Sequence, residues 1–227
     1  EYEELSFLFE KIDTRISSDV IRSNIINILK YGSTPPKSVN NSDFDKLRVL
    51  TLKELGELDA AITVINEIST YEDNKELYDL IILEKNLIDY NLAAVCGVVD
   101  DETSTIKTNS YVLKVRIFCS YLNNKKEKAE FYNTLLLEDD DDGYFQALYN
   151  RLNGIDLNLK NIQDYNFDKE SLSLYSAIMR SINIPFSNDF INIKSSKLLK
   201  AIALSPTTDI QIRIEAAQRA YNLKSLD

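Results

Sequence analysis

Residues 52–65, LKELGELDAAITVI, decide the fold that we predict for this chain. An apolar helical pattern runs up to Leu55, and Gly56 then supplies a residue that tolerates left-handed backbone geometry. Five positions later the small Ala61 lies in a second apolar helical pattern. A glycine directly after a helix is a common stop signal. The stretch therefore predicts two helices joined by a tight turn.

Two later stretches superpose on the first one, namely residues 84–99, EKNLIDYNLAAVCGVV, and residues 119–135, CSYLNNKKEKAEFYNTL. Each holds a turn-forming residue five positions before an alanine: the three pairs are Gly56 and Ala61, Asp89 and Ala94, and Asn124 and Ala129. The offsets between successive turns are 33 and 35 residues. Self-similarity at such a period is typical of repeat architectures.

The mean period of 34 residues, together with Leu-Gly followed by Ala in LGELDAAITVI, resembles the tetratricopeptide repeat (TPR) family over about residues 45–138. The resemblance implies three antiparallel helix pairs stacked as an all-α, α-α superhelix, in which each pair buries its apolar face on the next. The alternative is an irregular helical bundle.

The rest of the chain reads as helices around these pairs, so we expect a single helical domain over residues 1–227. Residues 1–31 predict an N-terminal helical hairpin, and the proline-containing residues 32–45 predict a linker. Residues 144–227 predict further helices at 144–152, 169–182 and 195–204, then a last helix after Pro206 with Asp209 as its cap. We expect the last helix to cover the open end of the stack. It carries an apolar stripe of Ile210, Ile214, Ala217 and Tyr221, which Ile212, Ala216 and Ala220 widen.

Composition excludes several classes of function. A net charge of −10 disfavours nucleic acid as a partner, because the phosphate backbone is repelled. No apolar run approaches the roughly 18 to 20 residues of a membrane span. The chain has no histidine, which excludes Ser-His-Asp and Cys-His nucleophilic sites, and it has neither GxxxxGK[ST] nor GxGxxG. We therefore predict no catalytic residue, no cofactor and no enzymatic activity.

The acidic run at residues 138–143, EDDDDG, is the best metal candidate. Its spacing matches the first half of a calcium loop, but position twelve of that loop holds Tyr149 where a bidentate glutamate is needed. We therefore predict no metal site. The run is expected to be a solvated loop whose carboxylates favour the N-terminus of the next helix.

Cys96 and Cys119 are the only cysteines, and the repeat alignment places them on helices that touch. A disulfide between them would imply an oxidising compartment, so the alignment favours a periplasmic or exported protein. The alternative is a pair of buried thiols in a reducing cytoplasm. Because the sequence begins at Glu1, we expect a trimmed N-terminus, and whether a signal peptide or anchor preceded it stays open.

In the TPR family the first helix of each pair lines a concave groove. Carried onto this chain, the resemblance implies five peptide-binding residues: Lys46, Lys53, Asn86, Lys114 and Tyr121. Such a strip would suit an acidic or carboxylate-ended peptide. The alternative is that the neighbouring Leu50, Leu83 and Phe118 belong to the core and that the lysines only solvate a helix face.

The predicted function is a non-enzymatic scaffold or adaptor that binds a protein or peptide. Two alternatives remain: a structural subunit of an oligomer, and a helical enzyme that uses paired carboxylates. The sequence leaves the oligomeric state open.

Overall fold

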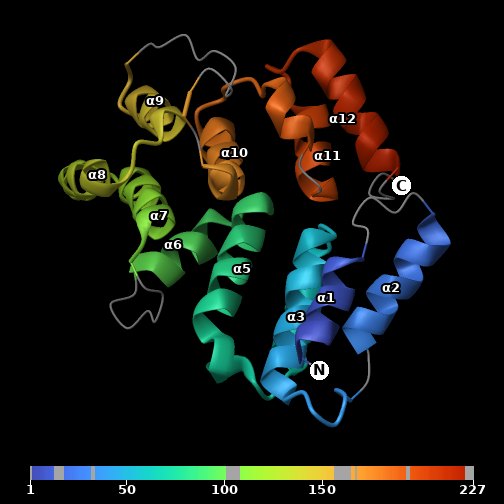
Figure 1. The fold of residues 1–227 in the computed structure, drawn as a ribbon. Coiled ribbons are helices and arrows are strands. Elements are labelled where there is room, and N and C mark those ends of the chain that lie inside the picture. Colours follow the sequence, from blue (N-terminus) through green and yellow to red (C-terminus); the bar gives the residue numbers. More distant parts are fainter. Residues whose placement is uncertain are drawn as a thin grey trace. The chain divides into compact units, whose positions relative to one another are not determined.

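The computed structural model describes residues 2–12, 18–31, 34–100, 108–155, 165–166, 168–192 and 195–222. Within these residues every regular element is an α-helix or a short 3₁₀-helix, which confirms the predicted all-α class (Figure 1). The chain divides into two compact units, residues 1–85 and 86–227, and the boundary falls within α5 (Lys75–Ile88). The single domain expected over residues 1–227 stays a prediction.

Unit 1 is organised around α3 (Asn41–Glu54). This helix packs against α1 (Tyr2–Glu10), α2 (Asp19–Tyr31), α4 (Leu58–Glu67) and the 3₁₀-helix η1 (Tyr71–Asn74). The Asn40 side chain begins it by accepting a hydrogen bond from the Asp43 amide at 2.7 Å. Val49 and Leu52 are fully buried. Because α3 starts at Asn41, the helix begins inside the segment that the sequence predicted to be a linker.

Helices α2 and α3 are held together by two arginines that point in opposite directions. Arg22 of α2 donates to the Leu55 carbonyl at 2.6 Å, just after the end of α3. Arg48 of α3 donates to the carbonyls of Leu29 and Lys30 at 2.7 and 2.9 Å, in the last turn of α2. The last carbonyls of a helix lack partners in their own helix, and a cation there is favourable. Each helix therefore caps the other.

Unit 2 is organised around α7 (Ser110–Leu122), which packs against α6 (Leu92–Asp100), α8 (Lys126–Asp139) and α9 (Gly143–Leu152). Its side chains Val115, Ile117 and Phe118 are fully buried. The remaining helices are η3 (Lys169–Ser171) and α10 (Leu172–Ser181), then η4 (Asn188–Asn192), α11 (Ser196–Leu204) and α12 (Ile210–Asn222). Helix α10 packs on α9, and α11 and α12 pack on each other. Apart from η4, which the sequence did not predict, these helices follow the predicted bounds to within one residue.

Five helices end in the same left-handed turn. The residues with positive φ are Gly56, Tyr90, Asn124, Gly154 and Asn183. At each turn the amide of the following residue donates to a carbonyl five positions earlier, as Glu57 does to Leu52 at 2.9 Å, and all five of these bonds measure 2.8 to 3.0 Å. This is the Schellman motif, which satisfies carbonyls that the helix leaves unpaired. The first three turns are 34 residues apart, and the helices that follow them begin at Leu58, Leu92 and Lys126.

The structure corrects the middle segment of the predicted alignment by one residue. The left-handed residue is Tyr90, with φ of 59°, rather than Asp89. The fully buried counterpart of Ala61 is accordingly Val95, while Ala94 is only half-buried. Because bulky residues rarely adopt positive φ, the sequence pointed to the smaller neighbour.

Arginine capping of neighbouring helices recurs throughout the chain. Arg180 of α10 donates to the Leu87 carbonyl at 2.7 Å, and its guanidinium lies 4.6 Å from the centroid of the Tyr90 ring, so it holds the strained turn from outside. Of the seven arginines that the structure describes, six donate to carbonyls at or just after the end of a neighbouring helix: Arg22, Arg48, Arg116, Arg180, Arg213 and Arg219.

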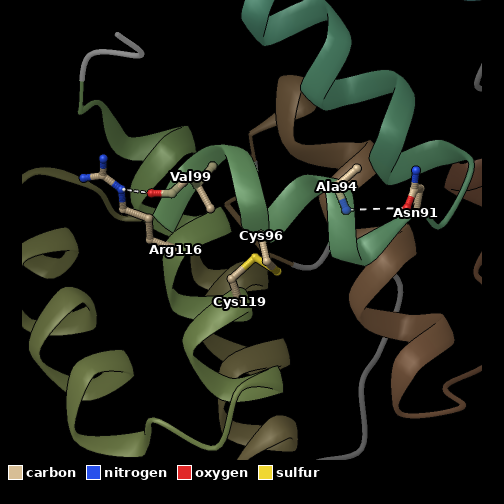
Figure 2. Close-up of a disulfide and its surroundings, with 6 residues drawn as sticks. All are labelled: Asn91, Ala94, Cys96, Val99, Arg116 and Cys119. Atoms are coloured by element: carbon tan, nitrogen blue, oxygen red, sulfur yellow. Dashed lines mark hydrogen bonds between the residues drawn. A yellow bond between two sulfur atoms is a disulfide. The ribbon is translucent and has the colours of Figure 1, made fainter. Parts of the chain in front are cut away.

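A disulfide joins α6 to α7. Cys96 and Cys119 are bonded, with their Cα atoms 5.4 Å apart, which confirms the predicted bridge (Figure 2). The same two helices are also joined by Arg116, which donates to the Val99 carbonyl at 3.2 Å (Figure 2). The oxidising compartment that the bridge implied stays a prediction.

The corrected register makes the two alanines respond differently to enlargement. We expect Ala61→Leu to lower the free energy of unfolding by about 1 to 3 kcal/mol, because the fully buried site has no room for three more carbons. Ala94→Leu should cost less than about 1 kcal/mol, because the half-buried side chain can extend toward solvent. Urea denaturation followed by circular dichroism measures both, and equal losses would contradict the corrected register.

Candidate functional site

The structure removes Lys114 from the predicted peptide-binding strip. Its side chain is fully buried, so no peptide can reach it. The ammonium pairs with Asp142 at 2.6 Å, with Asp140 at 2.9 Å and with Asp168 at 3.7 Å. A lysine in the interior of a protein requires such compensation, because an unpaired buried charge is very costly. Lys114 therefore belongs to the core of unit 2.

The acidic run supplies this pairing, so it is not the solvated loop that the sequence predicted. Asp142 is almost fully buried. One of its oxygens accepts from the Phe145 amide at 3.0 Å, which caps α9 as expected, and the other accepts from Lys114 and from the Tyr175 hydroxyl. The carboxylate of Asp140 also accepts from the Asp142 amide at 2.9 Å. The run thus carries a helix cap and a buried ion pair together.

The cluster strengthens the charged form of the lysine. Burial lowers the pKa of Lys114, but hydrogen bonds to Asp142 and Asp140 outweigh it and raise the pKa above its ordinary value. Burial, followed by the hydrogen bond to Asp142, raises the pKa of Tyr175. A protonated lysine saturated by carboxylates is neither a nucleophile nor a base. The cluster stabilises the fold and offers no reactive group.

The other four predicted binding residues remain at least partly accessible. In unit 1, Lys46 is half-buried, and Lys53 pairs with Glu84 at 2.8 Å, so its charge is already matched within the protein. In unit 2, Asn86 and Tyr121 are half-buried. Nothing in the structure tests whether any of them contacts a peptide. Leu83 and Phe118 are buried in the core, as the alternative interpretation expected.

A polar cleft of about 240 Å³ lies between η4 and α12, lined by Asn188, Asp189, Ile191, Asn192, Glu215 and Arg219. Arg219 donates to the Ile191 carbonyl at 3.0 Å, to Asn192 at 3.1 Å and to Glu215 at 2.8 Å. The guanidinium is thus satisfied within the protein. Glu215 is likewise engaged, as the ion-pair partner of Arg219.

Three large side chains of the apolar stripe of α12 lie on the surface, and the role of this helix as a cover stays a prediction. Ile210, Ile214 and Tyr221 are 55%, 46% and 69% exposed, while the helix packs inward through the fully buried Ala216 and Ala220. The remaining exposed positions of α12 are Gln211, Gln218 and Asn222, while the charged Glu215 and Arg219 lie outside the stripe and pair with each other, with side chains 46% and 42% exposed. Leu204, at the end of α11, is 68% exposed. Sequence periodicity found the stripe but could not tell which of the two apolar faces of α12 is buried.

In the described part of the chain, no group of three or more histidine, cysteine, aspartate or glutamate residues could hold a metal ion. None of the described helices is long and apolar enough to cross a membrane.

No protein family, no curated protein and no solved structure matches this chain.

Removal of the buried lysine should destabilise unit 2. We expect Lys114→Met to lower the free energy of unfolding by about 3 to 5 kcal/mol, because Asp140 and Asp142 lose their counter-ion. Lys197→Met is the matched control, since Lys197 pairs with Asp89 at 3.1 Å with its side chain 48% exposed. The control should cost less than about 1 kcal/mol. Urea denaturation measures both, and a small effect of Lys114→Met would show that the cluster does not stabilise the fold.

Alkaline pH should unfold the protein by titrating the same cluster. The raised pKa values of Lys114 and Tyr175 mean that the folded state favours the ammonium and the neutral phenol. Their contribution is complete below the ordinary values of 10.5 and 10.0 and is lost as the pH rises through the higher folded values. Burial, with the nearby Asp45 as the next cause, raises the pKa of Tyr78 to about 12, which acts in the same direction.

We therefore expect the free energy of unfolding to decline above about pH 10. The absorbance of tyrosinate should rise later in the folded protein than in the urea-denatured protein. The prediction is contradicted if tyrosinate forms at the same pH in the folded and the denatured protein and the free energy of unfolding does not change up to about pH 11.5.

Proposed function

We propose that this chain is a non-enzymatic scaffold that binds a helical segment of a partner protein along α12. The observation that carries the proposal is the outward face of that helix, where Ile210, Ile214 and Tyr221 are exposed with no charged residue among them. Protein interfaces are depleted of charge at their centre and enriched in aromatic side chains. This face has both properties in a protein of which 27% of the residues are charged.

The spacing of the face suits a helix as the ligand. Ile210, Ile214, Ala217 and Tyr221 recur at intervals of four, three and four residues and form one row along α12. Recognition of an amphipathic helix uses anchors at this spacing. Ala217 is small and lies in the middle of the row, where it leaves room for a second helix to approach closely. The partner is expected to present an apolar row of its own, and binding should depend little on salt.

The scaffold proposal includes a repeated architecture. Three helix-turn-helix segments with turns 34 residues apart support TPR-like helix pairs, whose stacking into a superhelix is part of the proposal. The helical-enzyme alternative has less support, because Asp140 and Asp142 pair with Lys114, and Glu215 in the polar cleft pairs with Arg219. The structural-subunit alternative would use a different surface of the protein, which lies on α2.

A photo-crosslinking amino acid at Ile214 tests the proposal in the cells that make the protein. We expect one defined crosslinked product, whose contact segment maps to a helix with an apolar row. The same amino acid at Lys200, an exposed position on α11, is the control and should give no such product. Adding Tyr221→Lys should reduce the product at least about tenfold, because a central aromatic anchor of an interface typically contributes more than 1.4 kcal/mol.

The contact must then be reproduced with isolated components. A synthetic peptide of the mapped segment should bind the purified chain, and Ile214→Lys should weaken the affinity at least about tenfold. The proposal fails if Ile214 gives no product, if Lys200 gives the same product, or if the peptide binds the Ile214→Lys variant equally well.

A further inference from the structure

Helix α2, labelled in Figure 1, belongs to unit 1. Its side chains form a second exposed face without charge. Its described exposed residues are Val20, Ile21, Ser23, Asn24, Asn27, Ile28 and Tyr31. The four large apolar side chains among them are 54% to 70% exposed. Leu29 is buried on the opposite side of the helix, where Arg22 and Arg48 fasten α2 to α3. Ile21 and Ile28 therefore both lie in solvent.

The centre of this face has a pattern that is the same in both directions along the helix. Val20, Asn24, Asn27 and Tyr31 form one row, at intervals of four, three and four residues. Apolar residues lie at both ends of the row and amides lie at its centre. Ile21 and Ile28 flank the row on one side. A surface with this arrangement is complementary to itself after a twofold rotation.

We propose that α2 docks against α2 of a second copy of this chain, antiparallel and across a twofold axis between Asn24 and Asn27. In this pairing Val20 of each copy meets Tyr31 of the other. Asn24 of each copy meets Asn27 of the other, so this contact occurs twice in the dimer. Ile21 of each copy lies beside Ile28 of the other. Both contacts fall on the same side of the interface, because the twofold rotation leaves these isoleucines of both copies on that side.

The two asparagines favour a second copy over an unrelated apolar helix. An amide that is covered without a hydrogen bond costs stability, so a partner must present polar groups at the centre of the row. A second α2 presents an amide at each of these two places, and each amide supplies both a donor and an acceptor. The row on α12 has Ile214 and Ala217 at its centre and imposes no such demand. The inference about α2 therefore does not rest on the function proposed for α12.

Area and charge set the strength of the association. The four apolar side chains expose on the order of 450 Å² per copy, or about 900 Å² for the pair, which lies below the range of stable interfaces. Each copy carries a net charge of −10, and the two copies repel one another. We expect a weak dimer with a Kd on the order of 10 to 100 µM. Association should strengthen with salt, because screening reduces the repulsion while the contact itself holds no ion pair.

Cysteine crosslinking tests the geometry. The native cysteines do not interfere, because both are held in the disulfide. Val20→Cys and Tyr31→Cys variants should form an intermolecular disulfide when they are mixed under mild oxidation. Neither variant should do so alone, because equivalent residues of an antiparallel pair lie about 16 Å apart along the helix axis, 11 residues at 1.5 Å each. A product from Val20→Cys alone indicates another orientation, and no product in the mixture indicates that α2 is not an interface; either result overturns the proposal.

Sedimentation velocity between about 5 and 500 µM tests the association itself. We expect a monomer-dimer equilibrium that moves toward the dimer between about 0.05 and 0.5 M NaCl. Ile28→Lys should weaken dimerisation at least tenfold with the helical circular dichroism retained. The matched control, Ile214→Lys on α12, should leave dimerisation unchanged. A monomer at every concentration, or equal losses in the two variants, would refute the α2 interface.

Discussion

The constraint on which the rest of this structure depends is the pairing of helix ends. The described α-helices are only nine to fourteen residues long, and each leaves its last four carbonyls without partners in its own helix. Two devices meet this need: left-handed turns within the chain and arginines from neighbouring helices. The turns set where each helix stops, and the arginines decide which helix lies beside it. Local geometry and tertiary packing are thereby settled by the same groups.

Much of the fold was predictable because its signals are local. The starts and stops of α9, α10, α11 and α12 follow from cap residues and apolar periodicity, and the Cys96 to Cys119 bridge follows from the repeat alignment. The one-residue error at Asp89 has a physical cause: Tyr90 adopts a left-handed conformation under the guanidinium of Arg180, which lies 90 residues later in the sequence. No local pattern carries that information.

The candidate sites were less predictable, because accessibility is a tertiary property. Lys114 was assigned to a groove from its place on a helix, yet the carboxylates that bury it come from after α8 and from before η3. Its signal in the sequence was a single lysine within the apolar run YVLKVRIF, residues 111–118. The exposure of the apolar faces of α2 and α12 was not predictable for a related reason: both helices are apolar on two sides, and only packing shows which side is covered.

The use of arginine at helix ends changes how the molecule presents its charge. The chain has 26 basic and 36 acidic residues, and part of the basic set is turned inward: Lys114 and Arg48 are buried, and the side chain of Arg22 is only 13% exposed. Lys114 and Arg48 pair with the buried Asp142 and Asp45, so these pairs remove equal charge of both signs and the net charge of −10 stays at the surface. Acidic macromolecules are repelled over most of this surface, and the repulsion is weakest at the two uncharged helix faces. Long-range electrostatics would thus direct encounters toward these faces by exclusion elsewhere, without contributing any attraction there.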